Sequence, residues 1–233
     1  MVKFLHLLTI FNLFLLSTTE TSLEIEVANH LTLLEDQTYF PINVYLSGLA
    51  TQLETLITNF SNYELDAAEV IHTYTDSIKE DVLIISETLE ETGVDIQPCE
   101  EHIHENFKQI VRNSLTDSKI VVLDGITKAQ RIISEAKNVF MAAQNRTLAV
   151  KLKIQNCMLL VDSTECLFEA LGMTVLLERT LPKIIAIVGQ QHEIQLTLLE
   201  DEIVADLEKI VVQVFDSHVE LLDEFLVCVL QWD

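Results

Sequence analysis

Carboxylates and imidazoles come together at one place in the sequence, the segment Glu100–Glu105, which reads EEHIHE. Carboxylate and imidazole groups are common ligands of divalent metals, so the composition first suggests a metal site. On a helix, however, residues two apart point about 200° away from each other, and His102 and His104 could not share one ion. We therefore interpret the segment as a solvated helix start, where acidic side chains suit the positive end of the helix dipole, and we expect no metal.

Local motifs that mark common catalytic sites are missing from the sequence, which has no G-x-S-x-G, P-loop, G-x-G-x-x-G or H-E-x-x-H motif. With 5 glycines in 233 residues, a Gly-rich loop that cradles a phosphate is hard to build. We expect no enzyme activity and no cofactor, although a triad assembled from distant residues is an alternative that the sequence leaves open. His72 and His218 lie near apolar stripes, and we interpret them as semi-buried packing residues.

The four cysteines, Cys99, Cys157, Cys166 and Cys228, are separated by gaps of 57, 8 and 61 residues. A zinc site would need closer pairs, so we expect two disulfides formed in an oxidising compartment. The spacing favours Cys99–Cys157 and Cys166–Cys228 over the other two connectivities. Each of these brackets holds a glycine, Gly125 or Gly189, where two helices could fold back as a hairpin and bring the cysteines together.

The first residues have the pattern of a secretory signal peptide, which we assign to residues 1–19. A lysine at position 3 precedes the apolar run Phe4–Leu16, and small residues follow it. The run is shorter than the roughly 20 residues of a membrane span, and no later segment is long and apolar enough. A buried or amphipathic N-terminal helix is the alternative. The sequons at Asn59 and Asn145 agree with export, and we expect a secreted, extracellular glycoprotein.

Composition favours long helices and excludes some partners. The net charge is −23, from 14 Lys and Arg against 37 Asp and Glu, so the surface repels phosphate backbones and we expect no nucleic-acid partner. Hydrophobic residues make up 49% of the chain, enough for a sizeable core. Only 5 Gly and 3 Pro are present, whereas a sheet of many short strands would need frequent turn residues.

The apolar pattern predicts which elements carry these residues. Apolar residues recur in steps of three and four from Leu46 to Leu89, which predicts one long helix with Pro41 at its start and Gly93 and Pro98 beyond its end. A second helical region follows Cys99, with a possible break at Gly125. Further punctuation at Pro182 and Gly189 precedes a last helix over residues 193–230.

We therefore predict an all-α fold, an antiparallel bundle of long amphipathic helices stapled by two disulfides. Residues 20–43 are expected to be an N-terminal lead-in segment, and residues 44–233 a single helical domain.

The signal peptide, the acidic helical body and the cysteine spacing, Cys99, then Cys157-x₈-Cys166, then Cys228, resemble the TsetseEP-type family of secreted insect proteins. The resemblance covers about Cys99 to Cys166, and the Glu-Pro repeats of the founding member are absent. It implies a secreted protein of gut, haemolymph, saliva or reproductive fluid without established enzyme activity. It carries over no catalytic residue.

These observations favour a non-enzymatic protein that acts by protein–protein interaction or self-association, with an unknown protein partner or a homo-oligomer. The seam from Leu46 to Leu89 is a candidate interaction surface, and core packing is its other use. The alternative function is a carrier that holds a lipid or other small apolar ligand in a helical-bundle cavity. Many aliphatic and few aromatic residues suit such a ligand, although they suit an ordinary core equally well.

Overall fold

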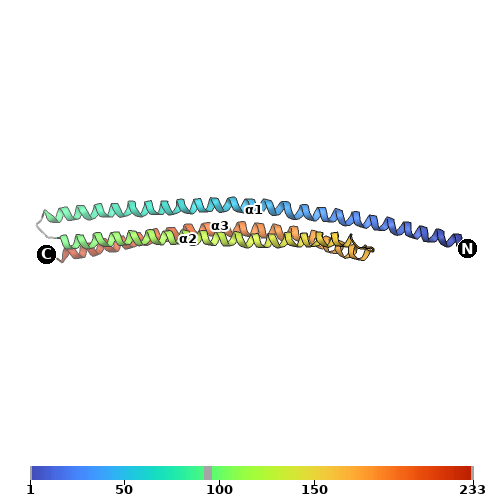
Figure 1. The fold of residues 1–233 in the computed structure, drawn as a ribbon. Coiled ribbons are helices and arrows are strands. Elements are labelled where there is room, and N and C mark those ends of the chain that lie inside the picture. Colours follow the sequence, from blue (N-terminus) through green and yellow to red (C-terminus); the bar gives the residue numbers. More distant parts are fainter. Residues whose placement is uncertain (1, 92–95, 232–233) are drawn as a thin grey trace. The chain divides into compact units, whose positions relative to one another are not determined.

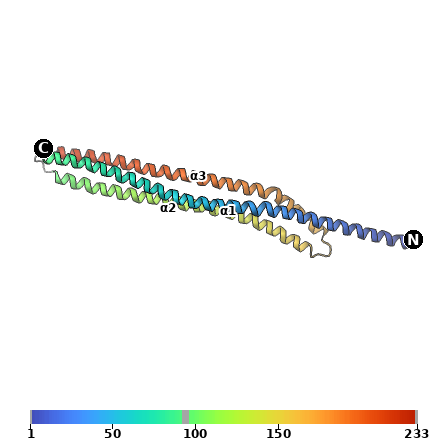
Figure 2. The same cartoon turned by 90° about the horizontal axis from the view of Figure 1, so that it is seen from above.

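The computed structural model describes the backbone of residues 2–91 and 96–231, with side chains from residue 22 onward. The chain forms three α-helices, α1 (Val2–Glu90), α2 (Gln97–Cys157) and α3 (Thr164–Leu230) (Figure 1). The described residues contain no strand. Successive helices run in opposite directions (Figure 2). The predicted all-α class, a bundle of long helices with two disulfides, is confirmed.

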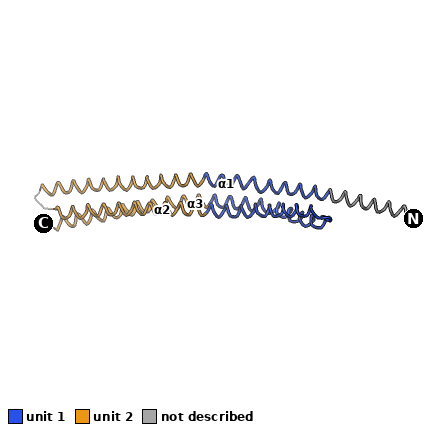
Figure 3. The backbone as a smooth tube through the Cα atoms, in the orientation of Figure 1, with its two compact units in different colours: residues 1–51, 132–194 blue, residues 52–131, 195–233 orange. Residues whose placement is uncertain are grey.

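The chain divides into two compact units, each built from parts of all three helices (Figure 3). Unit 1 comprises residues 1–51 and 132–194, and unit 2 comprises residues 52–131 and 195–233. The single domain expected over residues 44–233 and the lead-in over residues 20–43 stay predictions. The predicted signal peptide, residues 1–19, falls outside the residues whose side chains are described.

Buried side chains recur every eleven residues along the helices. Eleven residues make three turns of 3.67 residues, close to the 3.6 of a straight α-helix, so the same face of each helix stays turned toward the core. In α1 one such row is Val27, Thr38, Leu49, Phe60, Ile71 and Val82, and in α3 one is Thr174, Ile185, Leu196, Leu207, His218 and Val229. The apolar periodicity predicted from Leu46 onward therefore begins much earlier in α1.

The helix starts predicted at Pro41 and Pro182 are wrong, whereas α1 does end before Pro98, at Glu90. Pro41 lies inside α1 and Pro182 inside α3. A proline inside a helix costs roughly 3 kcal/mol because it removes a backbone donor and crowds the preceding turn. Buried residues lie within a turn of each proline, Thr38 and Ile42 near Pro41 and Leu181 and Ile185 near Pro182. Packing on both sides of the proline therefore holds each helix together.

The breaks predicted at Gly125 and Gly189 are also wrong, because both glycines lie inside helices where a neighbouring side chain approaches the backbone. A Cβ at Gly125 would lie 2.6 Å from Cδ1 of Ile203 and 3.2 Å from Cε2 of Phe60. A Cβ at Gly189 would collide with the ring of Tyr45. These glycines admit close helix packing, and neither turns the chain.

The two disulfides join Cys99 to Cys228 and Cys157 to Cys166, with Cα–Cα distances of 6.0 and 5.5 Å. The pairing favoured by the sequence is wrong. It required a hairpin inside each bracket, but α2 and α3 each run without a break. A continuous helix separates its ends by about 1.5 Å per residue, so cysteines near opposite ends of one helix cannot bond. Cys157–Cys166 instead closes the turn between α2 and α3, and Cys99–Cys228 clasps the start of α2 to the end of α3.

Candidate functional site

Charge is distributed unevenly over the three helices. Helix α2 carries nine Lys or Arg against six Asp or Glu, a net of +3. Helix α1 carries two against fourteen, and α3 three against thirteen. A surface between α1 and α3 is therefore bordered by acids, whereas α2 supplies the cations.

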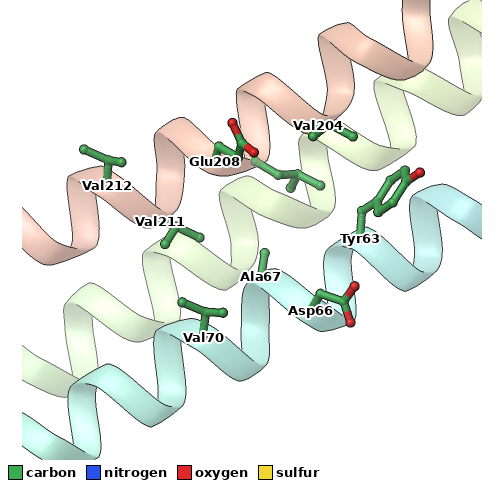
Figure 4. A pocket seen from close by; sticks show the side chains of 9 residues that line it. Tyr63, Asp66, Ala67, Val70, Val204, Glu208, Val211 and Val212 are labelled. Carbon is green, nitrogen blue, oxygen red and sulfur yellow. The ribbon is translucent and has the colours of Figure 1, made fainter. Parts of the chain in front are cut away.

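In unit 2, α1 and α3 leave an aliphatic groove between them, which we call the α1–α3 groove (Figure 4). Its volume is about 420 Å³. Val70 on α1 and Val212 on α3 are 43% and 54% exposed, although both are aliphatic. Asp66 and Glu208 stand among the aliphatic side chains (Figure 4). The lining residues are Tyr63, Asp66, Ala67, Val70, Val204, Leu207, Glu208, Val211 and Val212.

The α1–α3 groove continues along α1 into a second hollow of about 530 Å³, which shares Asp66 and Val70 with it. Glu69 adds a third carboxylate to the lining of this extension. The rings of Tyr74 and Phe215, 4.2 Å apart between centroids, pack across from α1 to α3 there. The groove and its extension together form an aliphatic and aromatic floor edged by acids.

Polar contacts join α1 to α3 at the Tyr63 end of the groove. The Tyr63 hydroxyl donates a hydrogen bond to Oε1 of Glu200 at 3.0 Å, and Nδ2 of Asn59 donates to the same oxygen at 2.7 Å. The hydrogen bond to Glu200 raises the pKa of Tyr63 above its ordinary value, and burial adds to the effect. The tyrosine therefore stays protonated and offers its ring to the groove.

The histidines and acids of the segment Glu100–Glu105 do not form a site. His102 and His104 are both exposed on α2, and Nδ2 of Asn106 donates a hydrogen bond to Nε2 of His102 at 3.1 Å. Across the residues whose side chains are described, no group of three or more His, Cys, Asp or Glu is arranged to hold a metal ion.

The two histidines interpreted as packing residues differ from each other. His72 is exposed, so that interpretation was wrong for it. His218 is fully buried, stacks on Phe107 with ring centroids 5.1 Å apart, and donates from Nδ1 to the Val214 carbonyl at 2.6 Å. Its Nε2 has no hydrogen-bond partner among the described residues. Burial lowers the pKa of His218, the carbonyl hydrogen bond opposes this, and the charge of Lys79 lowers it further.

Glycosylation stays a prediction at both sequons, which lie in helices. Asn145 is exposed on α2, although Thr147 of the same sequon is fully buried and donates to the Ala143 carbonyl at 3.2 Å. Asn59 is half-buried and engaged with Glu200. Asn145 is thus the more accessible acceptor of the two.

A further apolar surface lies in the turn closed by the Cys157–Cys166 disulfide. Residues 158–161, Met-Leu-Leu-Val, are all exposed, Leu159 by 83%. This turn belongs to unit 1. It presents apolar side chains outward, whereas the α1–α3 groove is hollow and offers walls on two sides.

The sequence did not reveal the α1–α3 groove, because its exposed valines, such as Val70 and Val212, lie beside the buried residues of α1 and α3. In α3, Ile203, Leu207 and Ile210 are buried, whereas their neighbours Val204, Val211 and Val212 are partly exposed or exposed. The only sign of the groove in the sequence is valines beside these buried residues. Whether such valines line a groove depends on which helix lies opposite.

No family model, curated protein or solved structure matches the chain. From residue 22 onward, the described parts of the helices contain no segment that is both long enough and apolar enough to cross a membrane.

Proposed function

We propose that the chain is a secreted, non-enzymatic interaction protein and that its α1–α3 groove binds an amphipathic helix of a basic partner protein. The observation that carries the proposal is an aliphatic groove, edged by acids, that the three-helix bundle of unit 2 leaves uncovered. The resemblance to the TsetseEP-type family supports the secreted, non-enzymatic part of the proposal.

A helix is the partner element that such a groove fits. Two neighbouring helices of a bundle offer a seam in which a further helix packs, as in four-helix bundles. Helices bound in this way insert apolar side chains spaced at i, i+3, i+4 and i+7. The lining segment of α1, residues 63–77, is about 21 Å long at 1.5 Å per residue, which about four turns of a partner helix match.

Charge selects a basic partner over a second copy of this chain. Asp66, Glu69 and Glu208 line the groove and its extension. Lys or Arg flanking the aliphatic stripe of a partner helix would meet these carboxylates, and the field of the chain would accelerate the encounter. A second copy brings another net charge of −23 and is repelled. Self-association through this groove is therefore the less favoured form of the interaction.

Fluorescence anisotropy with a labelled 15-residue helical peptide tests the proposal. The peptide has Leu at the i, i+3, i+4 and i+7 positions and Lys elsewhere, and a second peptide has Glu in place of Lys. We expect the Lys peptide to bind and the Glu peptide to bind at least about tenfold more weakly. Val212→Lys should weaken the Lys peptide at least about tenfold, because an aliphatic contact is lost and a like charge is added.

The matched control is Val219→Lys, which changes another exposed valine of α3 that does not line the groove. It should leave binding within about twofold. Equal loss in both variants, or equal binding of the two peptides, would contradict the proposal.

The alternative function is a carrier of a lipid or other small apolar ligand. The groove volume of about 420 Å³ falls within the range of small-ligand sites. Native mass spectrometry of protein secreted from eukaryotic cells separates the two functions. Extra mass that disappears on denaturation, and that Val212→Lys abolishes, would favour a carrier at this groove.

A further inference from the structure

Unit 2 also contains a separate groove between α1 and α2, which we call the α1–α2 groove. Its volume is about 510 Å³, and it gathers Lys79 from α1 with Lys108, Arg112 and Lys119 from α2. These are four of the 14 Lys and Arg in the whole chain. Apolar residues of α2 lie between the cations, namely the fully buried Phe107 and the half-buried Val111 and Leu115.

Such a concentration of cations is unusual on a chain with a net charge of −23. Lys108 and Arg112 are four residues apart on one helix, a spacing at which like charges destabilise the helix. Asp76 pairs with Lys79 at 3.0 Å and Glu105 with Lys108 at 3.3 Å, in exposed ion pairs that contribute little.

Over the described residues, no ion pair is recorded for Arg112 or Lys119. The α1–α2 groove therefore keeps an uncompensated positive charge above an apolar floor. Both grooves belong to unit 2, yet the α1–α3 groove and its extension contain no Lys or Arg.

We propose that the α1–α2 groove binds an anionic amphiphile of the fatty-acid class, with its carboxylate held by Arg112 and Lys119 and its aliphatic chain along the half-buried Val111 and Leu115. A guanidinium group binds a carboxylate through two parallel hydrogen bonds, and a neighbouring ammonium adds a second charge. The volume is within the range of small-molecule sites.

The charge of the whole chain selects a small anion over a polyanion. At physiological salt, charges act over about 8–10 Å, so an anion inside the groove feels chiefly the local cations. A nucleic acid or sulfated polysaccharide would extend beyond them onto α1, where acids outnumber bases fourteen to two. A single headgroup with one aliphatic tail uses both the cations and the apolar floor.

Isothermal titration calorimetry with laurate, below its micelle-forming concentration, tests the site on delipidated full-length protein. Acetate lacks the chain, and dodecanol has the chain without the charge. We expect laurate to bind at least about tenfold more tightly than either. Affinity should rise at least about twofold for each methylene added from octanoate to laurate, because each methylene is removed from water on the groove floor.

Arg112→Gln combined with Lys119→Gln should weaken laurate at least about tenfold. The matched control is Lys137→Gln combined with Arg146→Gln, two exposed cations of the same helix that lie outside the groove. Circular dichroism checks that both double variants stay helical. Equal binding of laurate and dodecanol by the unsubstituted protein, or unchanged laurate binding by the first double variant, would overturn the proposal. Tighter binding of a sulfated oligosaccharide than of laurate would also overturn it.

The proposal is independent of the peptide site. Val212→Lys, on α3, should leave laurate affinity unchanged, and Arg112→Gln with Lys119→Gln should leave peptide affinity unchanged. Either site can therefore fail without the other.

Discussion

The α1–α3 groove and the α1–α2 groove share helix α1 and belong to the same unit, yet they carry opposite charge. Asp66, Glu69 and Glu208 line the first groove and its extension, whereas Lys79, Lys108, Arg112 and Lys119 line the second. Both floors are apolar. The difference arises because α2 alone has more bases than acids. In this bundle, the charge given to each helix decides which class of partner each groove can accept.

The same distribution draws the helices together. Lys128 of α2 contacts Glu202 of α3 and Asp124 of its own helix, each at 2.9 Å. Hydrogen bonds to Glu202 and Asp124 raise the pKa of Lys128 to about 12. Lys151 of α2 likewise contacts Glu35 of α1 at 2.9 Å in unit 1. A basic α2 thus bridges two acidic helices that would otherwise repel each other.

The largest effect we expect is from opening the disulfide that clasps unit 2. Cys99→Ser with Cys228→Ser removes a link across 129 residues, which a chain-entropy treatment values at about 5 kcal/mol. Cys157→Ser with Cys166→Ser removes a link across 9 residues, worth about 3 kcal/mol on the same basis. Denaturant titrations of the two variants measure how much unfolding free energy each has lost. A larger loss of stability in the Cys157→Ser, Cys166→Ser variant would contradict this prediction.

The first of these variants also sharpens the comparison of the grooves. Both grooves belong to unit 2, which the Cys99–Cys228 disulfide crosslinks. Removing this disulfide should therefore lower the affinity for the Lys peptide and for laurate together. Opening Cys157–Cys166, in unit 1, should leave both affinities within about twofold. If the first variant lost affinity for only one of the two ligands, the grooves would not depend on the same packing.

We expect an intermediate loss of stability on acidification, caused by a histidine whose ring packs against residues of both grooves. His218 stacks on Phe107 of the α1–α2 groove and lies 5.6 Å, between ring centroids, from Tyr74 of the α1–α3 extension. Burial holds the pKa of His218 below its ordinary 6.5, so the folded state binds the proton less well than the unfolded state. Stability from this group is complete above pH 6.5 and is lost as the pH falls through the lowered pKa.

Thermal unfolding from pH 7.5 to pH 5 measures this effect against His218→Phe, which keeps an aromatic ring in the core. The variant should lose less stability than the unsubstituted protein over that range. Lys79→Met is a second check, because the Lys79 charge contributes to the lowered pKa of His218. Removing that charge should bring the pKa of His218 closer to 6.5, so this variant should also lose less stability on acidification than the unsubstituted protein. Identical pH profiles for all three proteins would contradict the role of His218.

The smallest effect concerns the acids of the α1–α3 groove. Asp66→Asn with Glu69→Gln should weaken the Lys peptide by about three- to tenfold, because partly exposed charge pairs contribute about 1 kcal/mol or less each. Added salt should weaken the unsubstituted complex more than the variant complex. Laurate affinity should not change. Anisotropy and calorimetry on the same two proteins give the comparison, and an equal loss of both ligands would mean that the variant had perturbed unit 2 as a whole.

The fold class could be predicted because it depends on local pattern. Steps of three and four from Leu46 to Leu89 allow only a helix with one apolar face, and the scarcity of Gly and Pro excludes a sheet with many turns. Helix boundaries could not be predicted in the same way. Pro41 and Gly125 are local signals for an end or a break, but side chains from neighbouring helices pack around both positions and outweigh the local preference.

The candidate sites could be predicted from the sequence less well than the fold, because each groove is made by two segments distant in sequence. Val70 and Val212 look like ordinary surface valines until α1 and α3 are placed side by side. Arg112 and Lys119 look like solvated charges until Lys79 faces them from α1. The segment Glu100–Glu105, which the sequence singled out, has its two histidines exposed and forms no site.

The sequence by itself determined that this protein is helical, acidic and able to bury long apolar stripes, because hydrophobic periodicity and charge are properties of each residue and its near neighbours. Only the tertiary structure decided which cysteines pair, which glycines lie against a neighbouring helix and which charges border a common groove. Those outcomes depend on contacts between residues far apart in the chain, such as Cys99 with Cys228, and the spacing of residues along one helix does not specify which helix lies opposite.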